Sequence, residues 1–227
     1  MSRTPADVTL CAGRTAAIAI LLAVTPAASP AAAPDAVRTE GWELEQKSGD
    51  PTNGYALYAR PRAGSEYAEY RLEVPVDGKV EDVMAALEHN ILDPDTFPDG
   101  MERTLLRREG EMLIIYDYIA VPFLSDRDVV LQTEIGPDPK TGEPGVRWHA
   151  IQGEGPAPRK GVVRMPSSSG SWTLTPSERG TLAVYQSHVE FGGSLPAAFV
   201  ESRMPAEIVQ QAVNLRRTMR ERTLAQR

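Results

Sequence analysis

An arginine flanked by two aspartates opens the strand-like part of PFLSDRDVV, residues 122–130. Because successive side chains of a strand face opposite sides, Arg127 falls on the same side as Val129 and Leu131, and its two acidic neighbours fall on the other. A guanidinium carries N–H donors in a planar fork, which suits a carboxylate or a phosphate. The spacing therefore predicts a cation on the apolar face of a strand.

The acid nearest to Arg127 by strand is Asp117, in the preceding segment YDYIAV. Asp117 shares a side of that segment with Ile115 and Ile119, so it too is expected on the apolar face. An arginine buried without a partner costs several kcal/mol. Two interpretations stay open: an Arg127–Asp117 ion pair that orders the sheet, and an Arg127 side chain that binds a hydroxyl, carboxylate or phosphate of a ligand.

The residue patterns of common catalytic and metal sites do not occur in the sequence. His89, His149 and His188 fall in a predicted helix end and in two separate strands, and we expect them to be exposed or half-buried. No histidine pair has the HExxH spacing, the serines lack a nucleophile-elbow context, and no glycine-rich phosphate loop occurs. We therefore expect no catalytic residue, no metal and no cofactor.

The elements that must position these residues belong to a chain of 227 residues with a formal net charge of -7. A nucleic-acid binder needs a basic surface to replace phosphate counterions, so this acidic balance argues against one. The composition, 41% hydrophobic and 24% charged, is that of an ordinary globular domain. One well-buried domain is expected.

The first residues have the features of a secretory signal peptide. Arg3 and Arg14 precede the short apolar run TAAIAILLAV, and an Ala/Pro tract follows it. We expect a signal peptide over residues 1–33, a short linker over 34–40 and a domain over 41–222. The protein is then secreted or periplasmic, or membrane-anchored if the segment stays uncleaved.

The rest of the chain predicts two or three strands, a helix, about six more strands and a long final helix. YALYARP and YAEYRLEVPV form a hairpin signal, and Asp77 is expected to cap the helix in GKVEDVMAALEHN. Strand-like runs with short, turn-rich links then continue to residue 191, which favours antiparallel pairing. In the final helix, Pro205 is expected to cause a kink or a break.

Several segments resemble, in order, those of the START (StAR-related lipid-transfer) domain, a helix-grip fold of the Bet v 1-like superfamily. The resemblance covers residues 41 to about 220. Its pieces are GWELEQKSGD leading into GYALYAR, VPVDGKVEDVMAAL, YDYIAVPFLSDRDVV, GVVRMPSSSGSWTLTP and VYQSHVEFGGSLPAAFVE. The resemblance implies an α+β fold in which a curved antiparallel β-sheet wraps around a long C-terminal α-helix and encloses a hydrophobic cavity.

The function that the resemblance implies is non-enzymatic binding, and transfer, of one sterol, phospholipid or fatty-acid-like lipid. Family members have an acidic residue and an arginine together at the cavity, which implies a ligand-binding role for Asp117 and Arg127. Tyr116 and Tyr185 are further candidates, since an aromatic body with a hydroxyl tip suits an amphipathic ligand. Phe199, on the apolar side of the final helix, completes the expected ligand-binding set.

Two alternatives remain open at this stage. One is a cyclase- or aromatase-like enzyme acting on a hydrophobic substrate in the same cavity. The other is a ligand-sensing adaptor that recruits a partner through the basic helix end RRTMRER. For the carrier we expect a monomer that contacts membranes transiently and binds no nucleic acid.

Overall fold

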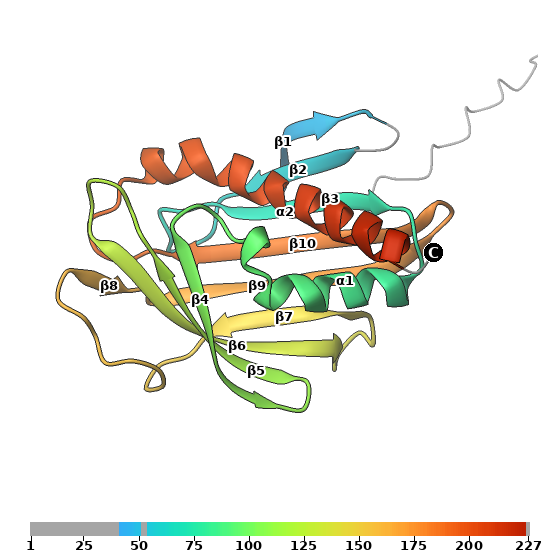
Figure 1. The fold of residues 1–227 in the computed structure, drawn as a ribbon. Coiled ribbons are helices and arrows are strands. Elements are labelled where there is room, and N and C mark those ends of the chain that lie inside the picture. Colours follow the sequence, from blue (N-terminus) through green and yellow to red (C-terminus); the bar gives the residue numbers. More distant parts are fainter. Residues whose placement is uncertain (1–40, 51–53, 226–227) are drawn as a thin grey trace, which may run out of the picture. The chain divides into compact units, whose positions relative to one another are not determined.

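The computed structural model describes residues 41–50 and 54–225, and the expected signal peptide over 1–33 and linker over 34–40 lie outside them. Ten strands and two α-helices follow one another in these residues (Figure 1). Their order is β1 (Glu43–Ser48), β2 (Tyr55–Arg60), β3 (Glu69–Val76), α1 (Val80–Leu92), a 3-10 turn η1 (Pro94–Thr96), β4 (Met101–Glu109), β5 (Met112–Ile119), β6 (Asp126–Pro137), β7 (Pro144–Ala150), β8 (Val162–Arg164), β9 (Ser167–Ser177), β10 (Gly180–Glu190) and α2 (Ala197–Ala225).

All ten strands join one sheet, in the order β1-β2-β3-β10-β9-β7-β6-β5-β4, with β8 paired to the start of β6. The pairs along this path are antiparallel, as the short links predict. The β6–β8 pair is parallel, so the expectation of antiparallel neighbours is wrong there. This pair forms across the longer segment 151–161, which gives the chain enough length to return in the same direction.

Both helices lie on the same face of the sheet, and the expected α+β helix-grip fold is confirmed (Figure 1). Alternation in the strands creates the apolar face that the helices cover: in β3, Tyr70, Leu72, Val74 and Val76 are buried and the residues between them are not. From the helices, the core receives Val83, Ala86, Leu87, Ile91, Ile208, Ala212, Leu215 and Met219.

The helix α1 begins later than its expected cap. Lys79 is the N-cap residue, with extended backbone and no side-chain hydrogen bond to the first turn, so the prediction that Asp77 caps this helix is wrong. Asp77 stands two residues before that position, out of reach of the orphan N–H groups that a cap must satisfy. After α1, Asp93 accepts a hydrogen bond from the Asp95 N–H and starts η1.

The final helix α2 is continuous through Pro205, so of the two expected effects of this proline, a kink or a break, the break is wrong. All but one of its buried side chains follow Pro205, and the exception is Val200. The basic end RRTMRER is only partly exposed: Arg220 and Glu221 face solvent, whereas Thr218 and Met219 are buried. Arg216 is buried and donates from Nη2 to the backbone oxygens of Gly54 and Pro75, at 2.6 and 2.9 Å. Its role is thus to hold α2 against the sheet.

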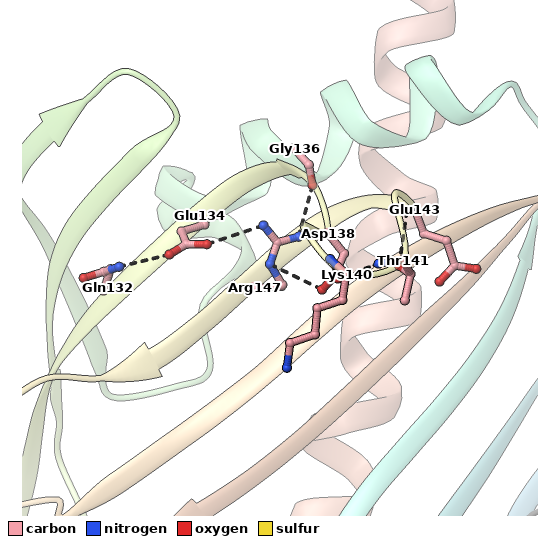
Figure 2. Close-up of polar contacts among 8 residues, drawn as sticks. All are labelled: Gln132, Glu134, Gly136, Asp138, Lys140, Thr141, Glu143 and Arg147. Atoms are coloured by element: carbon pink, nitrogen blue, oxygen red, sulfur yellow. Dashed lines mark hydrogen bonds and ion pairs between the residues drawn. The ribbon is translucent and has the colours of Figure 1, made fainter.

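Polar contacts at the β6–β7 turn fix the register of β6, the strand that carries Arg127 (Figure 2). Asp138 accepts hydrogen bonds from the N–H groups of Lys140 and Thr141, which hold the pKa of its carboxyl below the usual value. Arg147 contacts Glu134 at 3.4 Å and the Gly136 backbone oxygen at 3.3 Å. A one-residue slip would move every side chain of β6 to the other face.

Candidate functional site

A cavity of about 950 Å³ lies between the helix-covered face of the sheet and the two helices. This volume is at the upper end of the range for small-molecule sites, roughly 300–1,000 Å³. The strands contribute a mostly apolar wall, and the η1 loop, the loop after β5 and the first half of α2 form its other sides. The wall residues from the strands include Ile119, Val129, Leu131, Val146, Trp148, Trp172, Tyr185 and Val189.

The side chain of Arg127 lines this cavity and is 2% exposed, as its strand alternation predicts. Its guanidinium donates to two backbone oxygens: Nη1 to Ser125 and Nη2 to Gly192, the latter at 3.3 Å. Its Nε has no hydrogen-bond partner, and no acidic side chain in the part of the chain that the structure describes forms an ion pair with it. Arg127 is therefore a buried cation with free hydrogen-bonding capacity.

Asp117 also lines the cavity, but its partner is Arg103 of the edge strand β4. Arg103 Nε and Nη2 donate to the two carboxylate oxygens at 2.7 and 2.6 Å, and Nη1 donates to the Ile91 backbone oxygen at 2.9 Å. The proposed Arg127–Asp117 ion pair is therefore wrong. Arg103 and Asp117 are register partners on adjacent strands, whereas Asp117 stands opposite Val129 on β6. The pair is neutral as a whole and leaves Arg127 unmatched.

Tyr185 and Phe199, two other predicted site residues, also line the cavity. Tyr185 packs between two tryptophans, with ring centroids 5.5 Å from Trp148 and 5.1 Å from Trp172. Burial raises the pKa of its hydroxyl, so this wall is uncharged. Phe199 stands on α2, where Arg203 lies over its ring at 4.8 Å. The aromatic cluster offers a broad apolar surface to a ligand.

Tyr116 lies on the opposite face of the sheet, so its predicted place in the cavity wall is wrong. Its hydroxyl donates to Asp128 at 3.0 Å, and Asp128 also accepts from Arg164 at 2.7 and 3.1 Å. Asp128 is 1% exposed. Burial alone would raise the pKa of the Asp128 carboxyl, but the hydrogen bonds from Arg164 and Tyr116 outweigh it and lower the pKa. This network is structural.

The histidines do not form a catalytic relay with the cavity. His188 is buried, contrary to expectation, and its Nε2 lies 3.1 Å from Ser65 Oγ and 3.4 Å from Glu190 Oε1. A relay needs the nucleophile and the acid on different ring nitrogens. Burial lowers the pKa of His188, which favours the neutral ring. Within residues 41–50 and 54–225, no cluster of histidine, cysteine and acidic residues is arranged to hold a metal.

The comparisons with known proteins agree with this geometry. No protein-family model matches the chain. A STAR-related lipid transfer protein from Xanthomonas axonopodis superposes with a TM-score of 0.67 at 29% identity, over 79% of this chain and 99% of that one. The described domain has the START fold. The human StAR-related lipid transfer protein 5 superposes with a TM-score of 0.58 at 21% identity, over 81% of this chain and 88% of that one.

The chain is also similar in sequence to an uncharacterized protein of Pseudomonas aeruginosa, with 29% identity over 166 residues, which are 72% of this chain and 79% of the relative. The sequence predicted Arg127, Asp117, Tyr185 and Phe199 as site residues, but it did not predict Arg103. Arg103 lies in a strand-like run with four other charged residues, and such a run does not show which face of the strand is buried. None of the described helices is both long and apolar enough to cross a membrane.

Proposed function

We propose that this protein binds one hydrophobic ligand in its cavity and carries it between membranes. The observation that carries the proposal is the cavity itself, about 950 Å³ between the sheet and α2, with a mostly apolar wall. Burial of apolar ligand surface there contributes roughly 25 cal/mol per Å². Transfer of this kind needs no covalent step. This agrees with the polar side chains of the cavity wall, which form hydrogen bonds within the protein or have no side-chain partner.

The similar solved structures support the same class of ligand. The Xanthomonas axonopodis and human relatives are described as lipid transfer proteins. Lipids are therefore the class to test first on this chain, with sterols, phospholipids and fatty acids as the expected members. The carrier function of the chain itself is our inference from the cavity and from this likeness.

The route into the cavity is proposed to pass between the first half of α2 and the loop after β5. Val121 and Pro122 of this loop line the cavity, and the next residue, Phe123, is fully exposed. Phe123 has a φ of 65°, and it is the one non-glycine residue with positive φ in the described ranges. A residue in this region is strained. Its exposed ring is well placed to enter a membrane surface while the cavity is being loaded.

Native mass spectrometry of the purified protein, followed by extraction and identification of the bound molecule, tests the proposal. We expect one lipid per chain, and saturable binding of a fluorescent fatty acid or sterol that this lipid displaces. A lipid panel without saturable binding would overturn the carrier. Chemical conversion of the bound molecule would instead support the enzyme alternative in the same cavity.

A further inference from the structure

The cavity wall holds one buried cation that the protein leaves largely unmatched. Arg127 is 2% exposed, its two side-chain hydrogen bonds go to backbone oxygens, and its Nε lacks a partner. Neutral carbonyls do not compensate a full positive charge, and a buried charge without an opposite charge is costly. The site is therefore electrostatically incomplete when the cavity contains no ligand.

The acids around Arg127 are engaged elsewhere or lie at the mouth of the cavity. Asp117 binds Arg103 through both oxygens. Asp126, the sequence neighbour, accepts from the Tyr118 hydroxyl and from the Val121 N–H. The remaining acids of the wall, Asp99 and Glu207, are exposed. Asp126 offsets part of the charge by proximity, but it forms no ion pair with Arg127.

The wall becomes more apolar with distance from Arg127 along β6. Two residues further on, Val129 stands opposite Asp117, whose charge Arg103 cancels. Leu131 and Thr133 follow on the same face, and Trp148 and Trp172 line the cavity beside them. At about 3.3 Å per residue, Arg127 and Thr133 are about 20 Å apart. The β6 side of the cavity therefore has an unpaired cation at one end and apolar or neutral side chains along the rest of the strand.

We propose that the ligand is an amphipath with a single anionic head, a carboxylate or a phosphate, which binds Arg127 while its apolar tail extends along β6 toward the two tryptophans. This inference rests on the proposed function, because it names the ligand class of the same cavity. The free Nε–H and a second N–H of the guanidinium form the fork that carboxylate and phosphate oxygens accept. The anion then completes the charge balance of the wall.

Binding of three ligands with the same tail tests this inference: hexadecanoic acid, hexadecyl phosphate and the neutral 1-hexadecanol, at pH 8. Charge-assisted hydrogen bonds contribute about 1.5–3 kcal/mol, so the native full-length protein should bind at least one of the anions about tenfold or more tightly than the alcohol. The two anions are separate arms and distinguish a carboxylate from a phosphate head. This comparison needs no variant.

Arg127→Met should then make the affinities for anion and alcohol nearly equal, because the anion loses its charged partner. Arg203→Met is the matched control, because Arg203 also lines the cavity but is exposed at its mouth. It should keep the preference for the anion. If Arg127→Met does not fold, Arg127→Lys keeps the charge without the fork and should bind the anion less tightly than the native protein.

The outcomes separate this inference from the proposed function. Equal affinity of the native protein for the alcohol and both anions overturns the anionic head and leaves the lipid carrier standing. An unchanged preference in a folded Arg127 variant, or loss of the preference in Arg203→Met, also overturns it. Failure of all three compounds and of sterols to bind the native protein rejects the carrier itself.

Discussion

At the level of single residues, the ion pair between Arg103 and Asp117 makes a measurable contribution to folding. Both side chains are largely withdrawn from water, with 17% and 4% exposure. Removing one partner of a buried pair leaves an uncompensated charge and costs about 3–5 kcal/mol. We expect Arg103→Leu or Asp117→Leu to lower the free energy of unfolding by this amount in urea denaturation, and the double variant to recover most of it.

A control for this prediction is the exposed pair of Arg107 and Glu109, 47% and 56% exposed. Glu109→Gln should change the free energy of unfolding by only about 0–1 kcal/mol, because solvent screens such pairs. The double variant of Asp117→Leu with Arg127→Leu should not recover stability, since these two residues do not pair. The observed geometry would be contradicted if stability recovered in that double variant but not in the double variant of Asp117→Leu with Arg103→Leu.

Asp128 makes the free energy of unfolding depend on pH, and the direction of this dependence follows from the pKa of its carboxyl. The hydrogen bonds from Arg164 and Tyr116 lower its folded-state pKa below that of the unfolded chain, despite burial. Its contribution to stability is therefore complete above about pH 4 and is lost as the pH falls through the folded-state pKa. Asp128→Asn should be less stable at pH 7 and should show a shallower fall in the free energy of unfolding below about pH 4. Parallel curves for both proteins would show that Asp128 does not titrate in this way.

The sequence shows which side of β5 is apolar but not which strand supplies the partner of Asp117. Alternation places Asp117 on the cavity side, and the same alternation places Tyr116 on the other, so consecutive residues of one strand cannot both contact the ligand. The choice between Arg103 and Arg127 depends on pairing register, including the irregularity between Leu105 and Arg107 in β4. Register of this kind is set by tertiary contacts, which local spacing does not reveal.

At the level of elements, the two halves of α2 are held to the rest of the domain very differently. After Pro205, Asn214 donates to the Thr96 backbone oxygen at 2.8 Å and Thr218 donates to the Asn90 side chain at 2.7 Å. Before Pro205, the first half packs in a small separate cluster with Tyr67 and Leu195. The first half also lines the cavity, so it is the part of α2 suited to open.

Pro205 weakens this first half, because it cannot donate the helical hydrogen bond to residue 201. Pro205→Ala should raise the free energy of unfolding by up to about 3 kcal/mol and slow ligand exchange. Ala206→Gly, at the exposed next position, should have the opposite effects and costs about 1 kcal/mol. Stopped-flow displacement of a fluorescent lipid measures the exchange rate. An equal rate in both variants would place the entrance elsewhere.

The identity of the elements was largely predictable, and their arrangement was not. Alternation in segments such as EYRLEVPV and the helical spacing of Val80, Val83, Met84 and Leu87 predict a strand and a helix, as observed. The order of the sheet puts β10 between β9, its neighbour in sequence, and β3, which lies far from it in the sequence. The parallel pairing of β8 also depends on distant contacts. Only the resemblance to START domains predicted that α2 covers a cavity.

At the level of the whole molecule, export is a prediction from the sequence alone, because residues 1–33 lie outside the described part. Arginines before a short apolar run and small residues after it are recognised by secretion machinery. N-terminal sequencing of the protein from the exported fraction should give a first residue between Ala28 and Asp35. A chain that starts at Met1 and stays in the cytoplasm would contradict export.

Transfer between membranes depends on contact of the protein with the membrane as well as on its affinity for the lipid. A substitution of the exposed Phe123 distinguishes these two contributions. Placing a Phe side chain in an apolar environment contributes roughly 1.5–3 kcal/mol. Phe123→Asp should therefore slow lipid transfer between vesicles about tenfold or more while leaving the affinity for a soluble lipid probe unchanged. Leu44→Asp is the control, since Leu44 is 56% exposed on the edge strand β1. If both variants transfer at the native rate, the loop after β5 is not the contact. If only Leu44→Asp is slow, the β1 edge faces the membrane instead.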